Sequence, residues 1–149
     1  MTLLFHVLLV LNALWFGSAF VYFGVVPVTA AKIRVPRALR DSPLFVTLAA
    51  SIRCLGGMNL ALSVFALFLL GAPRLFPDPR QAAVFCGVFG LAHATQLLFN
   101  IPVLLAERGE ARASGALWPV TRAPMLFIFV VDGTLAAANL LLSAALVSA

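Results

Sequence analysis

An aspartate inside an apolar run is the residue of this sequence with the clearest potential for chemistry. Asp132 lies in the stretch from Met125 to Val147, which consists mainly of Leu, Ile, Val, Phe, Ala and Met. An ionisable side chain in a membrane helix costs about 2.5 to 3.5 kcal/mol even on a lenient insertion scale, which makes it a candidate functional group. Proton transfer, ligand binding and ion pairing are the roles open to it.

Six further polar residues interrupt the apolar runs. Counted by helical rise from the helix ends near the basic loops, their depth along the helices ranges from about 7 to 23 Å. Hydrocarbon offers no hydrogen-bond partner, so these side chains should turn inward and bond to one another. We predict that they form, with Asp132, a polar ligand-binding pocket: Asn12, Asn59, His93, Gln96, Asn100 and Asn139.

Arg53 offers an alternative explanation of Asp132. The second and fourth apolar runs would cross the membrane in the same direction, with both residues in the halves near the basic loops. A structural ion pair of Arg53 with Asp132 therefore competes with a proton-active or ligand-facing Asp132 near His93. In an enzyme, His93 or Asp132 would be the general acid or base. No catalytic residue is assigned, and whether the chain is an enzyme stays open.

Composition and spacing argue against several familiar kinds of site. Two histidines can ligate one haem only at the same level, but His6 and His93 differ by about 12 Å in depth along their helices. Zinc or di-iron sites need at least three converging His, Cys, Asp or Glu ligands. The seven polar residues of the predicted pocket, called the polar band below, include one histidine and one aspartate. No metal and no cofactor is predicted.

Composition places the chain in a membrane. It has 149 residues, 63% hydrophobic and 10% charged, whereas soluble domains have about 25% charged residues. A membrane-spanning helix needs about 20 apolar residues. Four runs meet that length and leave no room for a soluble domain, so we predict a single transmembrane domain over residues 1–149 with these helices: 3–26, 44–70, 82–105 and 125–147.

The apolar runs predict helices because they are continuous and about twice as long as the 9 to 11 residues of a barrel strand. The predicted fold class is an all-α integral membrane protein, a four-transmembrane-helix bundle. The similar segments NLALS from Asn59 and NLLLS from Asn139 raise the alternative that two helical hairpins, helices one and two and helices three and four, are duplicates. Leucine-rich helices also produce such matches by chance.

The basic residues predict the orientation of the helices. Eight of the ten Lys and Arg residues lie in or beside the loops 28–43 and 106–122, and Arg74 and Arg80 lie on the other side. By the positive-inside rule both loops are cytoplasmic and both termini are outside. The net charge of +5 is therefore a topology signal, and nucleic acid is not a predicted partner.

The layout of four short-looped helices with a basic first loop resembles families of small bacterial membrane proteins, and this resemblance implies the bacterial inner membrane. The segment FNIPVLL (Phe99 to Leu105), followed by a loop with Trp118, is similar to the anthrone-oxygenase-like group. The similarity covers a short part of the chain and contains no functional motif, so no residue role follows from it.

Three functions fit these features. The first is binding of a hydrophobic small molecule with a polar head, such as a quinone, an isoprenoid or a lipid, in a mostly apolar pocket. The second is an accessory or structural subunit of a larger membrane complex, in which the polar band only joins helices. The third is a proton-coupled transporter, which at this length would act as an oligomer. The predicted partners are membrane lipids, with a small molecule, a homo-oligomer or a larger complex as alternatives.

Overall fold

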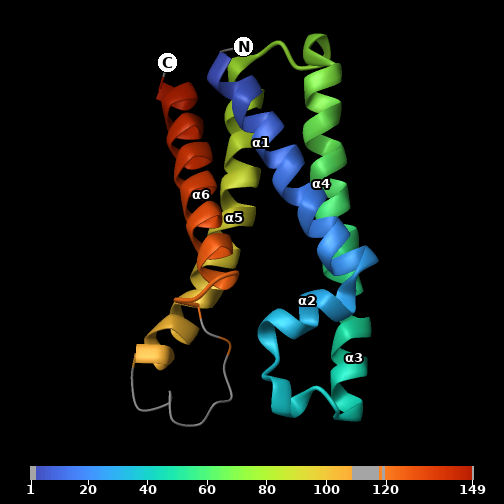
Figure 1. The fold of residues 1–149 in the computed structure, drawn as a ribbon. Helices are drawn as coiled ribbons and strands as arrows, with labels where there is room; N and C mark the ends of the chain where they lie inside the picture. Colours follow the sequence, from blue (N-terminus) through green and yellow to red (C-terminus); the bar gives the residue numbers. More distant parts are fainter. Residues whose placement is uncertain (1–2, 109–117, 119, 149) are drawn as a thin grey trace.

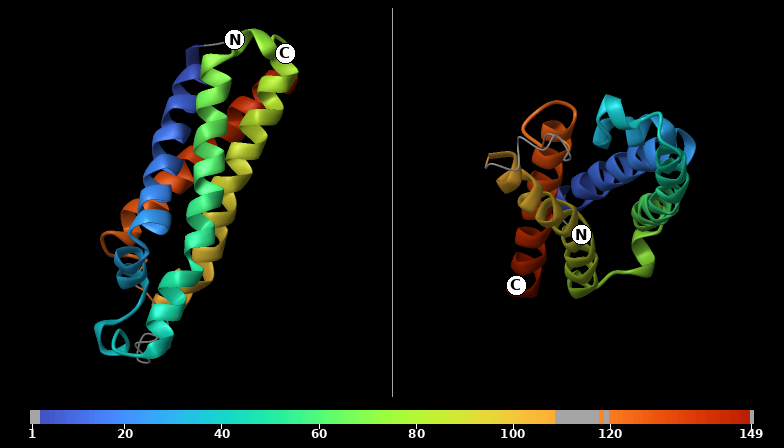
Figure 2. Two further views of the ribbon diagram at one scale, coloured as in Figure 1. Left: turned by 90° about the vertical axis from the view of Figure 1, so that its right-hand side faces the viewer. Right: turned by 90° about the horizontal axis from the view of Figure 1, so that it is seen from below.

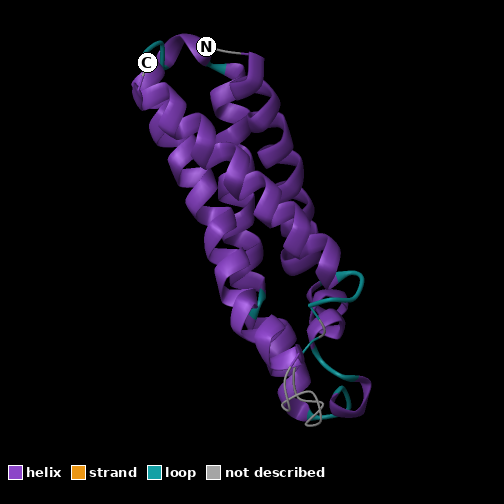
Figure 3. Ribbon diagram, turned by 90° about the vertical axis from the view of Figure 1, so that its left-hand side faces the viewer, coloured by secondary structure: helices purple, strands orange, loops and turns teal. Residues whose placement is uncertain are grey.

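The computed structural model describes residues 3–108, 118 and 120–148, and the elements in this part of the chain are all helical (Figure 3). Most of the predicted loop 106–122 lies outside the described residues. Four helices are long and apolar enough to cross a membrane, and they agree with the four predicted runs to within a few residues at each end: Leu3–Val25, Pro43–Gly71, Pro79–Arg108 and Met125–Ser148.

These four helices, called spans below for their length and composition alone, pack as two helical hairpins. The first is α1 (Leu3–Phe20) with α4 (Arg53–Gly71), and the second is α5 (Pro79–Arg108) with α6 (Met125–Ser148). Contacts between the hairpins are sparse and come mainly from α1. Figure 1 shows α1 crossing obliquely from the α5–α6 side to α4, and the view from below in Figure 2 separates the two hairpins. Both termini lie at the same end of the molecule (Figure 1).

The first span ends in a wide turn before Pro27. The N–H of Val26 donates to the carbonyl of Val21 at 3.0 Å, which closes the π-helical turn η1 (Val21–Val25). Proline has no N–H and pushes the preceding residue out of the helical region, and Val26 accordingly has φ −118° and ψ 53°. The chain changes direction there and begins α2 (Pro27–Arg34).

The segment 28–43, predicted as a loop, is largely helical. It contains most of α2 and the short 3-10 turn η2 (Arg37–Leu39). Arg40 ties the two together, because its guanidinium donates to the carbonyls of Lys32 at 2.6 Å and Val35 at 2.9 Å. These carbonyls lie in the last turn of α2 and at its C-cap residue, where a helix leaves acceptors unpaired. The basic segment is therefore an ordered structure below the spans.

The second span consists of two helices. Ser42 caps the first of them, α3 (Pro43–Ser51), by accepting a hydrogen bond from the N–H of Leu44 at 3.2 Å. Proline is favourable in the first helical turn because its missing N–H has no partner there. The helix is interrupted at Ile52, and α4 continues the span. A 3-10 turn, η3 (Pro73–Leu75), then leads to α5.

Small residues bring α1 and α4 together along their length. A Cβ atom on Gly56 would lie 2.5 Å from the Cα of Gly24, so the backbones of α4 and η1 are in direct contact. About two helical turns further along α4, the hydroxyl of Ser63 donates to the carbonyl of Ala13 at 2.8 Å. Such close backbone approach and hydroxyl bonding are typical of helix pairs in membranes.

A serine contact also joins the second hairpin, where Ser143 donates to the carbonyl of Ala83 at 2.7 Å. It has the same form as the Ser63 contact. The prolines of the two hairpins lie in different places, because Pro27 begins α2 whereas Pro102 lies inside α5. The pairing into hairpins is therefore observed, and their duplication stays a prediction.

Candidate functional site

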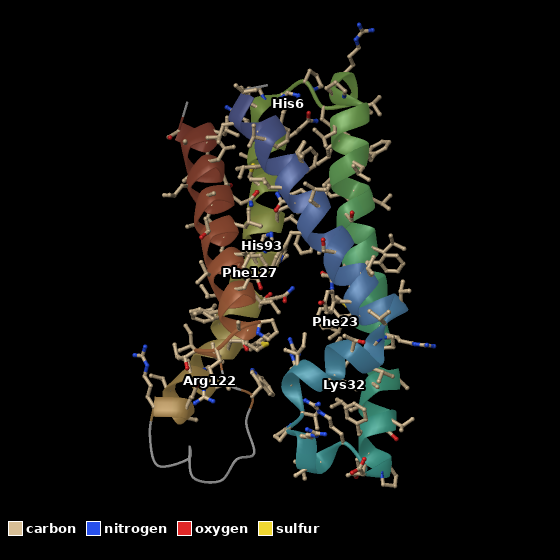
Figure 4. All side chains as sticks on the ribbon, in the orientation of Figure 1. His6, Phe23, Lys32, His93, Arg122 and Phe127 are labelled. Carbon is tan, nitrogen blue, oxygen red and sulfur yellow. The ribbon has the colours of Figure 1, made fainter. Side chains whose placement is uncertain are left out.

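His93 and Asp132 form a buried pair between α5 and α6. His93 Nδ1 lies 2.8 Å from Asp132 Oδ1, and their side chains are 0% and 1% exposed. The indole N–H of Trp15, from α1, donates to the same carboxylate oxygen at 2.9 Å. The imidazole also stacks on Phe16, with ring centroids 4.7 Å apart. Figure 4 shows His93 in the middle of the bundle, far from His6 at the end with the termini.

Two asparagines extend this pair and define the protonation of His93. Asn12 and Asn139 exchange reciprocal amide hydrogen bonds of 3.1 Å and 3.3 Å. Asn12 Oδ1 also lies 2.9 Å from His93 Nε2. Because an amide oxygen can only accept, Nε2 carries a hydrogen. His93 Nδ1 therefore either accepts from a protonated Asp132 or, in an imidazolium, donates to its carboxylate.

One proton lies between His93 and Asp132 in both of these states, so the pair carries no net charge. Such a neutral arrangement avoids an unpaired charge in an apolar interior, which is costly. The network also connects the two hairpins, since Asn12 and Trp15 belong to α1 whereas its other members belong to α5 and α6. It can hold a proton and bond the hairpins together, but its burial keeps it from direct contact with a bulky ligand.

Arg53 does not pair with Asp132, which corrects the ion-pair hypothesis. The side chain of Arg53 is exposed, and the ion pair within the described part of the chain is His93 with Asp132. The reason is the pairing of the helices: α4 packs mainly on α1, and α6 packs mainly on α5. A long arginine side chain on that face extends outward with its charged head.

A cavity of about 480 Å³ lies between α4 and α5, beside α2 and η1. Its volume falls within the range of about 300 to 1,000 Å³ that is typical of small-molecule sites. Met58 and Phe99 at its rim are 66% and 77% exposed, so the cavity opens to the surroundings of the bundle. Apolar and polar side chains both line it: Phe23, Arg34, Leu55, Met58, Asn59, Leu62, Ala92, Thr95, Gln96, Phe99, Asn100 and Trp118.

Arg34 is the charged group of the cavity, and aromatic rings hold it in place. Its guanidinium carbon lies 5.7 Å from the ring centroid of Phe23 and 5.5 Å from that of Trp118. The indole N–H of Trp118 donates to Asn100 Oδ1 at 3.1 Å, and Asn100 Nδ2 donates to the carbonyl of Gln96 at 2.8 Å. Asn100 thus fixes the ring against which the guanidinium rests.

The environment of Arg34 has two opposing effects on its pKa. Burial lowers the pKa of the guanidinium from its ordinary value, while the charge of Asp132 acts in the opposite direction. Because the ordinary pKa of arginine lies above about 12, the side chain stays protonated at neutral pH. The half-buried charge is therefore permanent.

The predicted pocket residues divide between these two places. Asn12, His93, Asp132 and Asn139 form the buried network, whereas Asn59, Gln96 and Asn100 line the cavity. The sequence did not predict the other lining residues, and among these Phe23, Arg34 and Trp118 form the charged and aromatic part of the cavity. Arg34 is one of the basic residues that predict the topology. The signal that would have linked it with Trp118 is an arginine and an aromatic residue beside adjacent spans.

Among the described residues, no cluster of three or more His, Cys, Asp or Glu side chains could hold a metal ion. No protein-family model, characterised protein or solved structure matches the chain. The similarity of Phe99 to Leu105 to the anthrone-oxygenase-like group therefore carries no argument about function. The site is interpreted from its own residues.

Proposed function

We propose that this chain is an integral membrane protein that binds a hydrophobic small molecule with a polar head, of the quinone, isoprenoid or lipid class, in the cavity between α4 and α5. The observation that carries the proposal is a cavity of about 480 Å³ in which apolar walls surround the side-chain amides of Asn59 and Gln96. Small-molecule pockets have this composition, with a few polar groups that orient the ligand.

Insertion in the bacterial inner membrane, with both termini outside, is part of the same proposal. It is supported by the four long apolar helices and by large apolar side chains on the outside of each of them, such as Leu14, Leu67, Leu91 and Leu141. The basic residues support the orientation, and Lys32 and Arg122 lie at the same end of the molecule in Figure 4.

Cysteine labelling in intact cells tests this topology. Arg37→Cys, in the segment below the spans, should be shielded from an impermeant thiol reagent, and Pro77→Cys, between η3 and α5, should react, because only the latter faces outward. Both positions are exposed in the fold. The background carries Cys54→Ala, because Cys54 is exposed whereas Cys86 is buried. Labelling of Arg37→Cys with protection of Pro77→Cys would reverse the orientation.

Blocking the mouth of the cavity tests ligand binding. The protein should co-purify with a hydrophobic molecule that lipid extraction and mass spectrometry detect. Met58→Trp should lower its amount roughly tenfold, because a bulky ring at the rim occupies the opening. Leu67→Trp is the matched control, since Leu67 lies on the same helix, is 55% exposed and does not line the cavity.

The outcomes separate this proposal from its main rival. Ligand lost from Met58→Trp and retained by Leu67→Trp, with equal melting temperatures, supports the cavity. Equal ligand content in the two variants places the molecule elsewhere on the protein. A protein that carries no small molecule but co-purifies with another membrane protein would support the subunit function instead.

A further inference from the structure

We propose that the ligand of this cavity is an amphiphile with an anionic head, a carboxylate or a phosphate, and that Arg34 binds this head. The inference rests on the proposed binding function and narrows its ligand class. Four observations carry it. The Arg34 guanidinium lies against two aromatic rings, and it has no close acidic partner among the described residues. Arg40 of the same segment bonds to backbone carbonyls whereas Arg34 bonds to none that the structure describes, and the cavity continues from Arg34 between apolar side chains.

The aromatic contacts of Arg34 orient its hydrogen-bond donors. Phe23 and Trp118 lie 5.7 Å and 5.5 Å from the guanidinium carbon, at distances that cation–π contacts use. A guanidinium carries its five N–H donors in its own plane, in a fork that matches the two oxygens of a carboxylate or phosphate. A cation–π contact uses the charge of the guanidinium and not its N–H donors, so those donors stay available. Arg34 is therefore prepared for bidentate binding of an anion.

The charge of Arg34 has no close acidic partner among residues 3–108, 118 and 120–148. Within that part of the chain, no carboxylate oxygen lies within 4.0 Å of its guanidinium, and its N–H groups donate to no side chain or carbonyl. Asp132 attracts it only from a greater distance, and that carboxylate already binds His93 and Trp15. A half-buried cation gains from an anion at its side.

Arg40 shows how the same segment uses an arginine for structure. Its guanidinium donates to the carbonyls of Lys32 and Val35 and is thereby occupied in closing α2. Arg34, at the end of the same helix, makes no such bond to the described residues and lies instead at the boundary of two cavities, of about 480 Å³ and 340 Å³. The position of Arg34 is thus explained by a ligand better than by the fold.

The cavity extends from Arg34 along the spans, as the tail of an amphiphile requires. On α4 its lining runs from Leu55 to Leu62, and on α5 from Asn100 back to Ala92. At about 1.5 Å per residue these stretches are about 10 to 12 Å long. The head would lie at the end of the bundle that carries α2 and the tail would lie between the hairpins, with the amide of Gln96 beside it.

Binding of a matched set of twelve-carbon compounds tests the inference. Dodecyl phosphate, dodecanoate and dodecanol share one tail and differ in the head, and inorganic phosphate supplies a head without a tail. Native mass spectrometry of the whole chain in neutral detergent gives each dissociation constant. We expect both anionic compounds to bind roughly tenfold or more tightly than dodecanol, because charged hydrogen bonds contribute that much. Arg34→Gln should abolish this preference, and the exposed control Arg37→Gln should keep it.

Each result decides a different point. If dodecanol binds as tightly as the anions, the anionic class is wrong while the binding cavity stands, and if none of the three binds, both proposals fail. If inorganic phosphate binds as tightly as dodecyl phosphate, the tail contributes nothing, the amphiphile proposal is wrong, and the cavity holds a simple anion site.

Melting curves verify folding, and if Arg34→Gln does not fold, Arg34→Lys replaces it. Lysine keeps the positive charge but lacks the paired N–H donors of a guanidinium, so we expect a smaller preference for the anionic compounds over dodecanol. An unchanged preference would refute bidentate binding.

Discussion

His93→Phe is expected to lower the free energy of unfolding by about 3 to 5 kcal/mol, the range found when one partner of a buried ion pair is removed. Phenylalanine keeps a ring that can stack on Phe16 but makes neither of the hydrogen bonds of His93. Among the described residues, Asp132 would then keep only the hydrogen bond from Trp15, in a site where its side chain is 1% exposed. Adding Asp132→Asn should recover much of the loss, because no carboxyl group is then left buried without its imidazole partner. Thermal and denaturant melting in detergent measure both variants.

Two controls make this result specific to the pair. Arg53→Gln should melt within about 0.5 kcal/mol of the parent, because surface substitutions rarely cost more and Arg53 is exposed. Thr134→Ala should do the same, since Thr134 is exposed on α6 and, within the described part of the chain, its hydroxyl bonds only to the carbonyl of Val130. If Arg53→Gln were as destabilising as His93→Phe and Asp132→Asn restored it, Arg53 would be the partner of Asp132 after all.

The composition of the polar band could be predicted because burial alone constrains it. A polar side chain at that depth must find a partner, whatever the packing, and Asn12, His93, Asp132 and Asn139 do bond to one another. The four spans follow from length and hydropathy in the same way. These are properties of single helices, which a sequence specifies directly.

The choice of partners could not be predicted, because it depends on which helices are neighbours. Arg53 and Asp132 fit by depth and direction, but α4 packs on α1 and α6 on α5, so His93 takes the place assigned to Arg53. The cavity depends on the turn η1 in addition, because the change of direction at Val26 and Pro27 brings α2, with Arg34, beneath the spans. The depth of a residue along its helix, counted from the sequence, shows neither which helices are neighbours nor where the chain changes direction.

The contact between η1 and α4 suggests a second variant with a large effect. Gly56→Ala should lower the free energy of unfolding by about 1 to 3 kcal/mol or more, the cost of overpacking a close contact. Its new Cβ would meet the Cα of Gly24 at 2.5 Å and the carbonyl carbon of Phe23 at 3.1 Å. Backbone atoms cannot rotate away as a side chain can, so η1 must separate from α4. Because Phe23 is also a wall of the cavity, ligand content should fall together with the melting temperature.

The neighbouring glycine is a control that should change stability in the opposite direction. Among the described residues, a Cβ on Gly57 would meet no atom within 4 Å, and alanine in a helix interior is more favourable than glycine by about 0.5 to 1 kcal/mol. Gly57→Ala should therefore melt at or above the parent temperature with its ligand retained, although it differs from Gly56→Ala by one position only. Equal destabilisation of the two variants would mean that flexibility of α4, and not backbone contact with Gly24, is what the glycines provide. A stable Gly56→Ala variant with unchanged ligand content would show that η1 does not lie against α4, and the proposed placement of Phe23 and Arg34 beside the cavity would fail with it.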